Sequence, residues 1–155
     1  MKKSLYILLI FFWIIPSGFA QLKTHTFEEA EKLSTENPKP FVVFTYASWC
    51  NFCKKMENST FKNPEIITIL NADFYFIPLD AESKNNIDFN NHTFKFIPNG
   101  PTTGLHELAI SLATINSQLI YPTITILGSD YSILFQKHSF INARELKLVL
   151  EKLQK

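Results

Sequence analysis

One short segment constrains this chain more than any other. Cys50 and Cys53 are separated by two residues, and they are the only cysteines in the sequence. The run Phe41–Tyr46 before them is short, apolar and rich in β-branched and aromatic residues, which is typical of a buried strand. The segment Lys54–Thr60 after them is typical of a helix. The pattern predicts that Cys50 lies between the carboxyl end of a strand and the start of a helix.

The first twenty residues have the order of a secretory signal peptide. Two lysines precede an uninterrupted apolar run, Leu5–Ile15, and a segment of small residues ends at Ala20. The run is shorter than the roughly 20 residues that a membrane span requires. We therefore expect residues 1–20 to be a signal peptide and residues 21–155 to fold outside the cytoplasm, where disulfides are permitted. An uncleaved N-terminal anchor is the alternative.

Length and charge exclude some classes of function. A chain of 155 residues is one domain's worth of sequence, and a domain of this size buries roughly two-thirds of its unfolded surface. A formal net charge of +1 gives no electrostatic basis for binding nucleic acid. We expect a monomer with no nucleic acid partner.

Capping signals and hydrophobic periodicity predict that helices alternate with strands. Residues suited to cap a helix stand at Thr26, Asn63 and Asn142. A fourth helix is predicted from the spacing of Leu105, Leu108, Ala109 and Leu112, and Asn116-Ser117 is expected to end it. The predicted strands are Phe41–Tyr46, Phe74–Leu79, Tyr121–Leu127 and Tyr131–Gln136, with a weaker candidate at Leu22–Thr26. This alternation predicts an α/β fold with a mixed sheet covered on both faces.

The segment Asp80–Thr103 does not follow this alternation. It is polar and rich in asparagine, and a loop of this length is usually functional or mobile. Three phenylalanines within it, Phe89, Phe94 and Phe96, argue against full disorder because such side chains gain by being covered. A short strand is predicted at Thr93–Ile97.

The two cysteines are suited to thiol-disulfide exchange. A thiol attacks a disulfide as its thiolate, and the free amides and dipole at a helix start stabilise that anion. Cys50 occupies this position, so we expect it to be the nucleophile. Cys53 lies one turn further along and can resolve a mixed disulfide by attacking Cys50. This chemistry requires no cofactor beyond the dithiol itself.

Other uses of the cysteines stay open. A structural disulfide across two residues closes a very small loop and constrains the unfolded chain little. A metal site is a further alternative for the pair. Zinc requires four ligands, and His25, His92, His106 and His138 lack the paired spacing of a zinc site; copper(I) also favours thiolates. A copper- or zinc-handling protein and a redox-inactive binding module are therefore the alternatives to an oxidoreductase. We expect the histidines at 106 and 138 to be surface or capping residues.

The segment Trp49–Lys54, following an apolar strand, resembles the thioredoxin-like family. Tyr121-Pro122-Thr123, before a later strand, is similar to the cis-proline segment of that family. The longer run Trp49–Pro64 is similar to the C-terminal thioredoxin-like domain of DsbD-type thiol-disulfide interchange proteins and their single-domain exported relatives. The resemblance implies a thioredoxin fold, with a central mixed β-sheet flanked by helices and an expanded insert at 80–117 before the cis-proline strand.

The resemblance also implies roles for single residues. Cys50 and Cys53 would form the redox-active disulfide, Pro122 would face it, and Tyr121 would meet the substrate. Trp49 is expected to form a wall of the active site, although core packing is an alternative.

One position departs from the family pattern. Phe44 stands six residues before Cys50, where thioredoxin-type proteins usually carry a buried acid. Glu57 is the nearest acid in sequence and matches an acid of the DsbD-type domain, so we expect it to tune the acidity of the thiols; a solvated helix glutamate is the alternative.

The dipeptide Asn51-Phe52 adds no positive charge beside Cys50, which favours the reducing or isomerising side over a strong oxidant. The substrates would be disulfides in other exported proteins, and a membrane dithiol donor would recharge the protein.

Overall fold

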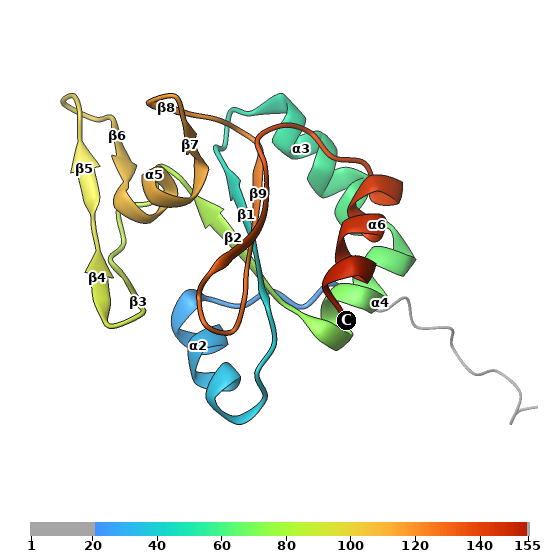
Figure 1. Ribbon diagram of the computed structural model, residues 1–155. Helices are drawn as coiled ribbons and strands as arrows, with labels where there is room; N and C mark the ends of the chain where they lie inside the picture. The colour runs from blue at the N-terminus through green and yellow to red at the C-terminus, as the bar shows by residue number, and fades with distance from the viewer. Residues whose placement is uncertain (1–20, 155) are drawn as a thin grey trace, which may run out of the picture.

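The computed structural model describes residues 21–154, so the signal peptide predicted at 1–20 lies outside the described residues. Helices and strands alternate along the first half of the chain, as predicted, and short strands interrupt the second half (Figure 1). In chain order the elements are α2 (Phe27–Glu36), β1 (Phe41–Tyr46), α3 (Asn51–Asn58), the 3-10 turn η2 (Thr60–Lys62), α4 (Pro64–Asp73), β2 (Tyr75–Asp80), β3 (Ile87–Phe89), β4 (His92–Phe94), β5 (Phe96–Pro98), β6 (Gly104–His106), α5 (Glu107–Ala113), β7 (Thr114–Ile115), β8 (Gln118–Leu119), β9 (Thr123–Leu127), β10 (Ile133–Lys137) and α6 (Ala143–Leu153).

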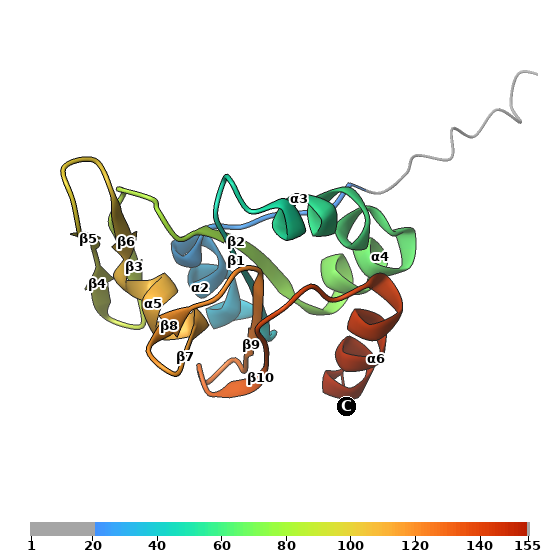
Figure 2. The same ribbon diagram turned by 90° about the horizontal axis from the view of Figure 1, so that it is seen from above.

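The central sheet has the strand order β10-β9-β1-β2. β1 and β2 run parallel, whereas β9 is antiparallel to both β1 and β10, so the sheet is mixed as predicted. Helices α3, α4 and α6 cover one face, and α2 and α5 cover the other (Figure 2). The predicted architecture is confirmed.

β1 supplies side chains to both layers of the core because successive residues of a strand point to opposite faces. Val42 and Phe44 pack in the cluster that contains Met56 of α3. Phe41 and Val43 pack in the cluster that contains Phe27 of α2. The continuously apolar run in the sequence is therefore a central strand buried on both sides.

Local caps begin the helices where the sequence predicted them, because the first amides of a helix have no partner within it. Thr26 Oγ1 accepts from Glu29 N–H at 3.1 Å, and Glu29 Oε2 accepts from Thr26 N–H at 3.0 Å, which completes a capping box. Asn63 Oδ1 accepts from Glu65 N–H at 3.0 Å. Asn142 Oδ1 likewise accepts from Glu145 N–H, at 3.0 Å.

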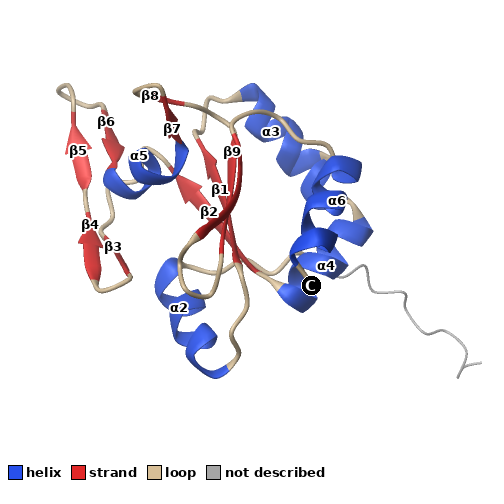
Figure 3. Ribbon diagram, viewed as in Figure 1, coloured by secondary structure: helices blue, strands red, loops and turns tan. Residues whose placement is uncertain are grey.

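The insert contains two hairpins, not the single strand predicted at Thr93–Ile97 (Figure 3). Its pairing breaks at Lys95, whose N–H donates to the Glu107 carboxylate at 2.7 Å and whose carbonyl accepts from Glu107 N–H at 2.9 Å. Asn90 and Asn91 have φ of 51° and 58°, which suits the two-residue turn between β3 and β4.

The structure also corrects the predictions for residues 116–117 and for Leu22–Thr26. Residues 116 and 117, predicted to end a helix, instead form the turn of the β7–β8 hairpin with φ of 49° and 63°. The segment Leu22–Thr26 is not a strand, because its one backbone bond to β2 is from His25 N–H to the Phe76 carbonyl, at 2.9 Å.

The insert contacts α2 through aromatic packing and through hydrogen bonds from its backbone amides to glutamate side chains of the helix. Phe89 is 5% exposed, and its ring centroid lies 4.9 Å from those of both Phe27 and Tyr131. Glu28 Oε1 accepts from Asp88 N–H at 2.9 Å, and Glu31 Oε1 accepts from Asn90 N–H at 2.9 Å. Phe89 therefore belongs to the core of the domain although it lies within the insert.

We expect Thr45→Val to raise the free energy of unfolding by about 1 kcal/mol. Thr45 is fully buried, and its hydroxyl has no hydrogen-bond partner among the residues that the structure describes. Valine has nearly the same shape and removes the unpaired hydroxyl. Urea denaturation is the measurement, and Thr123→Val is the matched control, because the Thr123 hydroxyl donates to the Ile120 carbonyl at 2.8 Å. A Thr45→Val variant less stable than the wild type would contradict this account.

His106 is fully buried, whereas the sequence predicted a surface or capping residue. It does cap a helix: Nδ1 accepts from Leu108 N–H at 3.3 Å, and this cap starts α5 after Leu105, which lies in β6 instead of the predicted helix. Nε2 lies 3.1 Å from the Asn85 carbonyl. A carbonyl only accepts, so Nε2 carries the hydrogen and the ring is neutral. Burial lowers the pKa of His106 below 6.5, and the Asn85 carbonyl and Glu107 raise it by less.

We expect the stability of the protein to fall as the pH drops below 6.5, because unfolded His106 takes up a proton that the buried ring does not. The loss runs from pH 6.5 down to the lowered folded pKa, at no more than about 1.4 kcal/mol per pH unit. His106→Asn keeps a capping side chain and removes the titration, so its unfolding free energy should vary less between pH 7.5 and 5.5. His92→Asn, at an exposed position, is the control; equal pH slopes for the two variants would refute the role of His106.

Candidate active site

The predicted position of the cysteine pair is confirmed. Cys50 is the N-cap of α3, with extended backbone angles, and its Sγ accepts from Cys53 N–H at 3.1 Å. Cys50 N–H donates to the Ala47 carbonyl at 3.0 Å, which closes the turn after β1. The two cysteines form a disulfide with a Cα–Cα distance of 5.2 Å. The helix thus begins at Cys50, whose sulfur accepts from an amide of the first turn.

The two cysteines differ in exposure. Cys53 is 1% exposed, whereas Cys50 is 7% exposed and lies at the end of the helix. When the disulfide is open, a thiolate at Cys50 is stabilised by the helix amides and dipole. Cys50 is therefore the better placed of the two for contact with another molecule.

The Tyr121–Pro122 peptide bond is cis, as the resemblance implied. β9 pairs with β1 through Thr45 and Thr123, so Pro122 lies next to the end of β1 at which the cysteine turn begins. The Thr123 hydroxyl donates to the Ile120 carbonyl at 2.8 Å and lies 3.2 Å from His138 Nδ1. These contacts link Thr123, the residue after Pro122, to Ile120 and to His138.

Trp49 and Tyr121 are brought together although they are far apart in the sequence. Their rings meet edge to face with centroids 5.5 Å apart. Trp49 is 61% exposed, so the alternative of core packing does not hold for its side chain. Its Nε1 donates to Glu82 Oε1 at 3.0 Å.

Sequence reasoning missed Glu82, which lies in the turn just after β2. One signal was available, because the carboxyl ends of parallel neighbouring strands meet at the same edge of a sheet. An acid that follows β2 therefore lies near the turn that follows β1.

Phe44 fills the position where an acid was expected. It is 2% exposed, and its ring packs on Tyr46 at 5.5 Å and on Phe61 at 4.8 Å between centroids. Glu57, exposed on α3, lines a pocket of about 370 Å³ together with Phe44. Glu57, the acid nearest in sequence to the cysteines, thus lines the same pocket as the position where an acid was expected. Its effect on the thiols stays a prediction.

Two phenols flank the cysteine turn. Burial raises the pKa of Tyr121 to about 12, and the charges of Glu82 and Asp80 add to this effect. Burial, followed by Asp80 and Glu57, also raises the pKa of Tyr46. Both phenols therefore stay protonated at neutral pH, where they can donate hydrogen bonds but cannot serve as bases.

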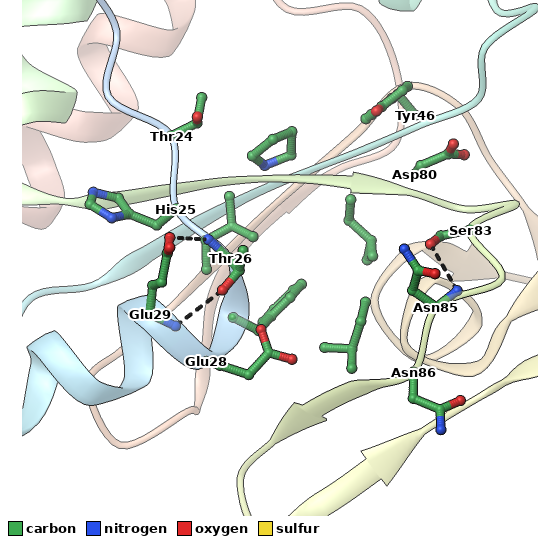
Figure 4. A pocket seen from close by; sticks show the side chains of 15 residues that line it. Thr24, His25, Thr26, Glu28, Glu29, Tyr46, Asp80, Ser83, Asn85 and Asn86 are labelled. Atoms are coloured by element: carbon green, nitrogen blue, oxygen red, sulfur yellow. Dashed lines mark hydrogen bonds between the residues drawn. The ribbon is translucent and has the colours of Figure 1, made fainter.

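A larger pocket, of about 480 Å³, lies along the outer edge of β2 (Figure 4). The start of α2 and the segment from 83 to 87 close its sides, and Tyr46 and Asp80 lie toward the end of β2. Neither cysteine lines it, so it is separate from the thiol chemistry.

The residues that the structure describes, 21–154, lack both a metal-binding cluster and a membrane-spanning helix. Among them, no cluster of three or more His, Cys, Asp or Glu side chains is arranged to hold a metal ion. No helix in this part of the chain has both the length and the apolar character needed to cross a bilayer.

The mixed sheet, the cysteine pair at the start of α3 and the cis-proline beside it define a thioredoxin-type domain. The chain belongs to the thioredoxin-like family, since the family model described as a thioredoxin-like domain matches residues 27–154.

Similar solved structures agree with this assignment. The DsbH oxidoreductase has a TM-score of 0.63 at 19% identity, over 90% of this chain and 89% of that chain. A thioredoxin from Thermus thermophilus has 0.60 at 17%, over 85% and 86%. The C-terminal domain of Neisseria meningitidis DsbD in the reduced form has 0.52 at 21%, over 80% and 90%. At these identities the likeness concerns the fold.

One curated protein is similar in sequence over a shorter range. The uncharacterized protein B0495.5 of Caenorhabditis elegans is 33% identical over 61 residues. This match covers 39% of this chain and only 8% of that protein.

Proposed function

We propose that the protein is an exported thiol-disulfide oxidoreductase. It exchanges disulfides with other exported proteins through Cys50 and Cys53. The observation that carries the proposal is the disulfide at the N-terminus of α3, with the more exposed of the two cysteines at the helix end. The signal-like order of the first twenty residues supports export.

The reaction proceeds in two exchanges. The Cys50 thiolate of the reduced protein attacks a substrate disulfide, forms a mixed disulfide and releases one substrate thiolate, which takes a proton from solvent. Cys53 then loses its proton and attacks Cys50 Sγ. The Cys50–Cys53 disulfide forms, and the second substrate thiolate leaves and is protonated. Two electrons and two protons pass to the substrate, and a membrane dithiol donor returns them to the protein.

Charges around the motif favour the reducing or isomerising side. A strong oxidant stabilises its reduced form, usually through positive groups near the thiolate. Here Asn51 and Phe52 between the cysteines are uncharged, so this dipeptide adds no positive group beside the thiolate. A thiolate without such stabilisation makes the dithiol a better electron donor.

The test is the reduction potential of the cysteine pair, measured against glutathione. We expect a value of about −270 mV, as for thioredoxin, and a value of about −120 mV would instead indicate an oxidant. Failure of the pair to cycle would overturn the proposal. Stoichiometric copper or zinc on the reduced protein, without reduction of insulin disulfides, would favour metal handling.

A further inference from the structure

Glu82 has no part in the two exchanges, yet it joins three segments of the site. Its carboxylate accepts from Trp49 Nε1 at 3.0 Å, and Trp49 directly precedes Cys50. The Trp49 ring in turn meets Tyr121, which directly precedes Pro122. The turn that opens the insert is therefore linked to the cysteine turn and to the cis-proline segment through a single side chain.

The backbone around Glu82 is fixed. Its N–H donates to Asp80 Oδ1 at 3.0 Å, and Ser83 N–H donates to the Asp80 carbonyl at 3.2 Å. The preceding residue, Ala81, is fully buried; it donates to the Tyr46 carbonyl at 2.9 Å and accepts from His106 N–H at 2.8 Å. The carboxylate of Glu82 thus extends from a turn that is bonded to both β1 and β6.

Trp49, by contrast, is a mostly exposed side chain at the edge of the site. An indole has a single hydrogen-bond donor, and Glu82 takes it. Because the Trp49 ring is mostly exposed, burial contributes little to fixing its position. The charge-assisted bond to Glu82 and the edge-to-face contact with Tyr121 hold the side chain in one rotamer.

We propose that Glu82 is a positioning residue that holds Trp49 against Tyr121, so that the two rings form a fixed wall beside Cys50 for a polypeptide disulfide. This inference rests on the proposed function. The wall meets a substrate that extends beyond its sulfur atoms. A protein disulfide should therefore depend on Glu82 more than a small disulfide does.

The experiment compares Glu82→Ala and Glu82→Gln in the full chain with two substrates, insulin and oxidised glutathione. We expect Glu82→Ala to lower the second-order rate constant with insulin about tenfold, the effect of one lost hydrogen bond to a charged group. The rate with oxidised glutathione should change by less than about twofold on the same scale. Glu82→Gln keeps an acceptor oxygen and should restore the insulin rate.

Trp49 itself reports the position of the wall. The chain has two tryptophans, so Trp13→Phe leaves Trp49 as the only indole. In that background the fluorescence anisotropy should fall in Glu82→Ala and be kept in Glu82→Gln. Glu36→Ala is the matched control, since Glu36 is an exposed glutamate at the far end of α2.

The outcomes separate the two proposals. If the wild type reduces neither substrate, the proposed function fails and the inference fails with it. If the wild type is active and Glu82→Ala reduces insulin at the same rate, only the inference is overturned. A Glu82→Gln variant as slow as Glu82→Ala also overturns it, because the negative charge and not the position of Trp49 would then set the rate.

Discussion

Cys50→Ser is expected to abolish disulfide exchange, with a fall of at least about a thousandfold in the rate of insulin reduction. A serine hydroxyl is scarcely ionised at neutral pH, and an oxygen cannot form the mixed disulfide. Cys53→Ser should behave differently, because Cys50 at the helix end keeps its nucleophile. This variant should attack once and then remain joined to the substrate, since no second sulfur is present to release it.

Non-reducing gel electrophoresis with substrate distinguishes the two variants. Cys53→Ser should give a higher-mass species that disappears on addition of dithiothreitol, and Cys50→Ser should give none. The control is Ser48→Ala, an exposed hydroxyl in the same turn that should leave turnover intact. A trapped complex formed by Cys50→Ser and not by Cys53→Ser would reverse the assigned roles of the two cysteines.

Phe89→Ala is expected to cost about 3–5 kcal/mol of unfolding free energy, a large share of the roughly 5–15 kcal/mol that typically stabilises a domain. The reason is the cavity left between the rings of Phe27, Phe41 and Tyr131, which Phe89 contacts from within the insert. Denaturation by urea, followed by circular dichroism, is the measurement.

Ile97→Ala serves as the control for Phe89→Ala. It truncates an apolar side chain of the same insert, but Ile97 is 44% exposed, so its loss should change stability little. If Phe89→Ala were as mild as Ile97→Ala, the insert would be an appendage and not part of the core. The expected result also implies that deletion of the insert destabilises the domain.

The elements that the sequence predicted well are those whose causes lie within a few residues. The caps at Thr26, Asn63 and Asn142 each bond to an amide two or three residues ahead. Cys50 is likewise an N-cap that accepts from Cys53 N–H. Such contacts need no distant partner, and they place both sulfurs at the start of α3.

The insert was harder to predict because its strands depend on distant partners. Each is short, and each is held by pairing or by contacts to α2, such as the bond from Asp88 N–H to Glu28. His106 shows the same limit. Its capping role is local, but its complete burial follows from the segment around Asn85, which folds over it.

The sequence by itself determined the nature of the reactive group, its position at a helix N-terminus and the class of fold, because a strand, two cysteines and a helix adjoin in the chain. Only the tertiary structure decided what surrounds that group. Glu82 reaches Trp49 because β1 and β2 are parallel and end at the same edge of the sheet. Tyr121 reaches Trp49 because β9 pairs with β1. Strand pairing is a contact between distant segments, and no local pattern specifies it.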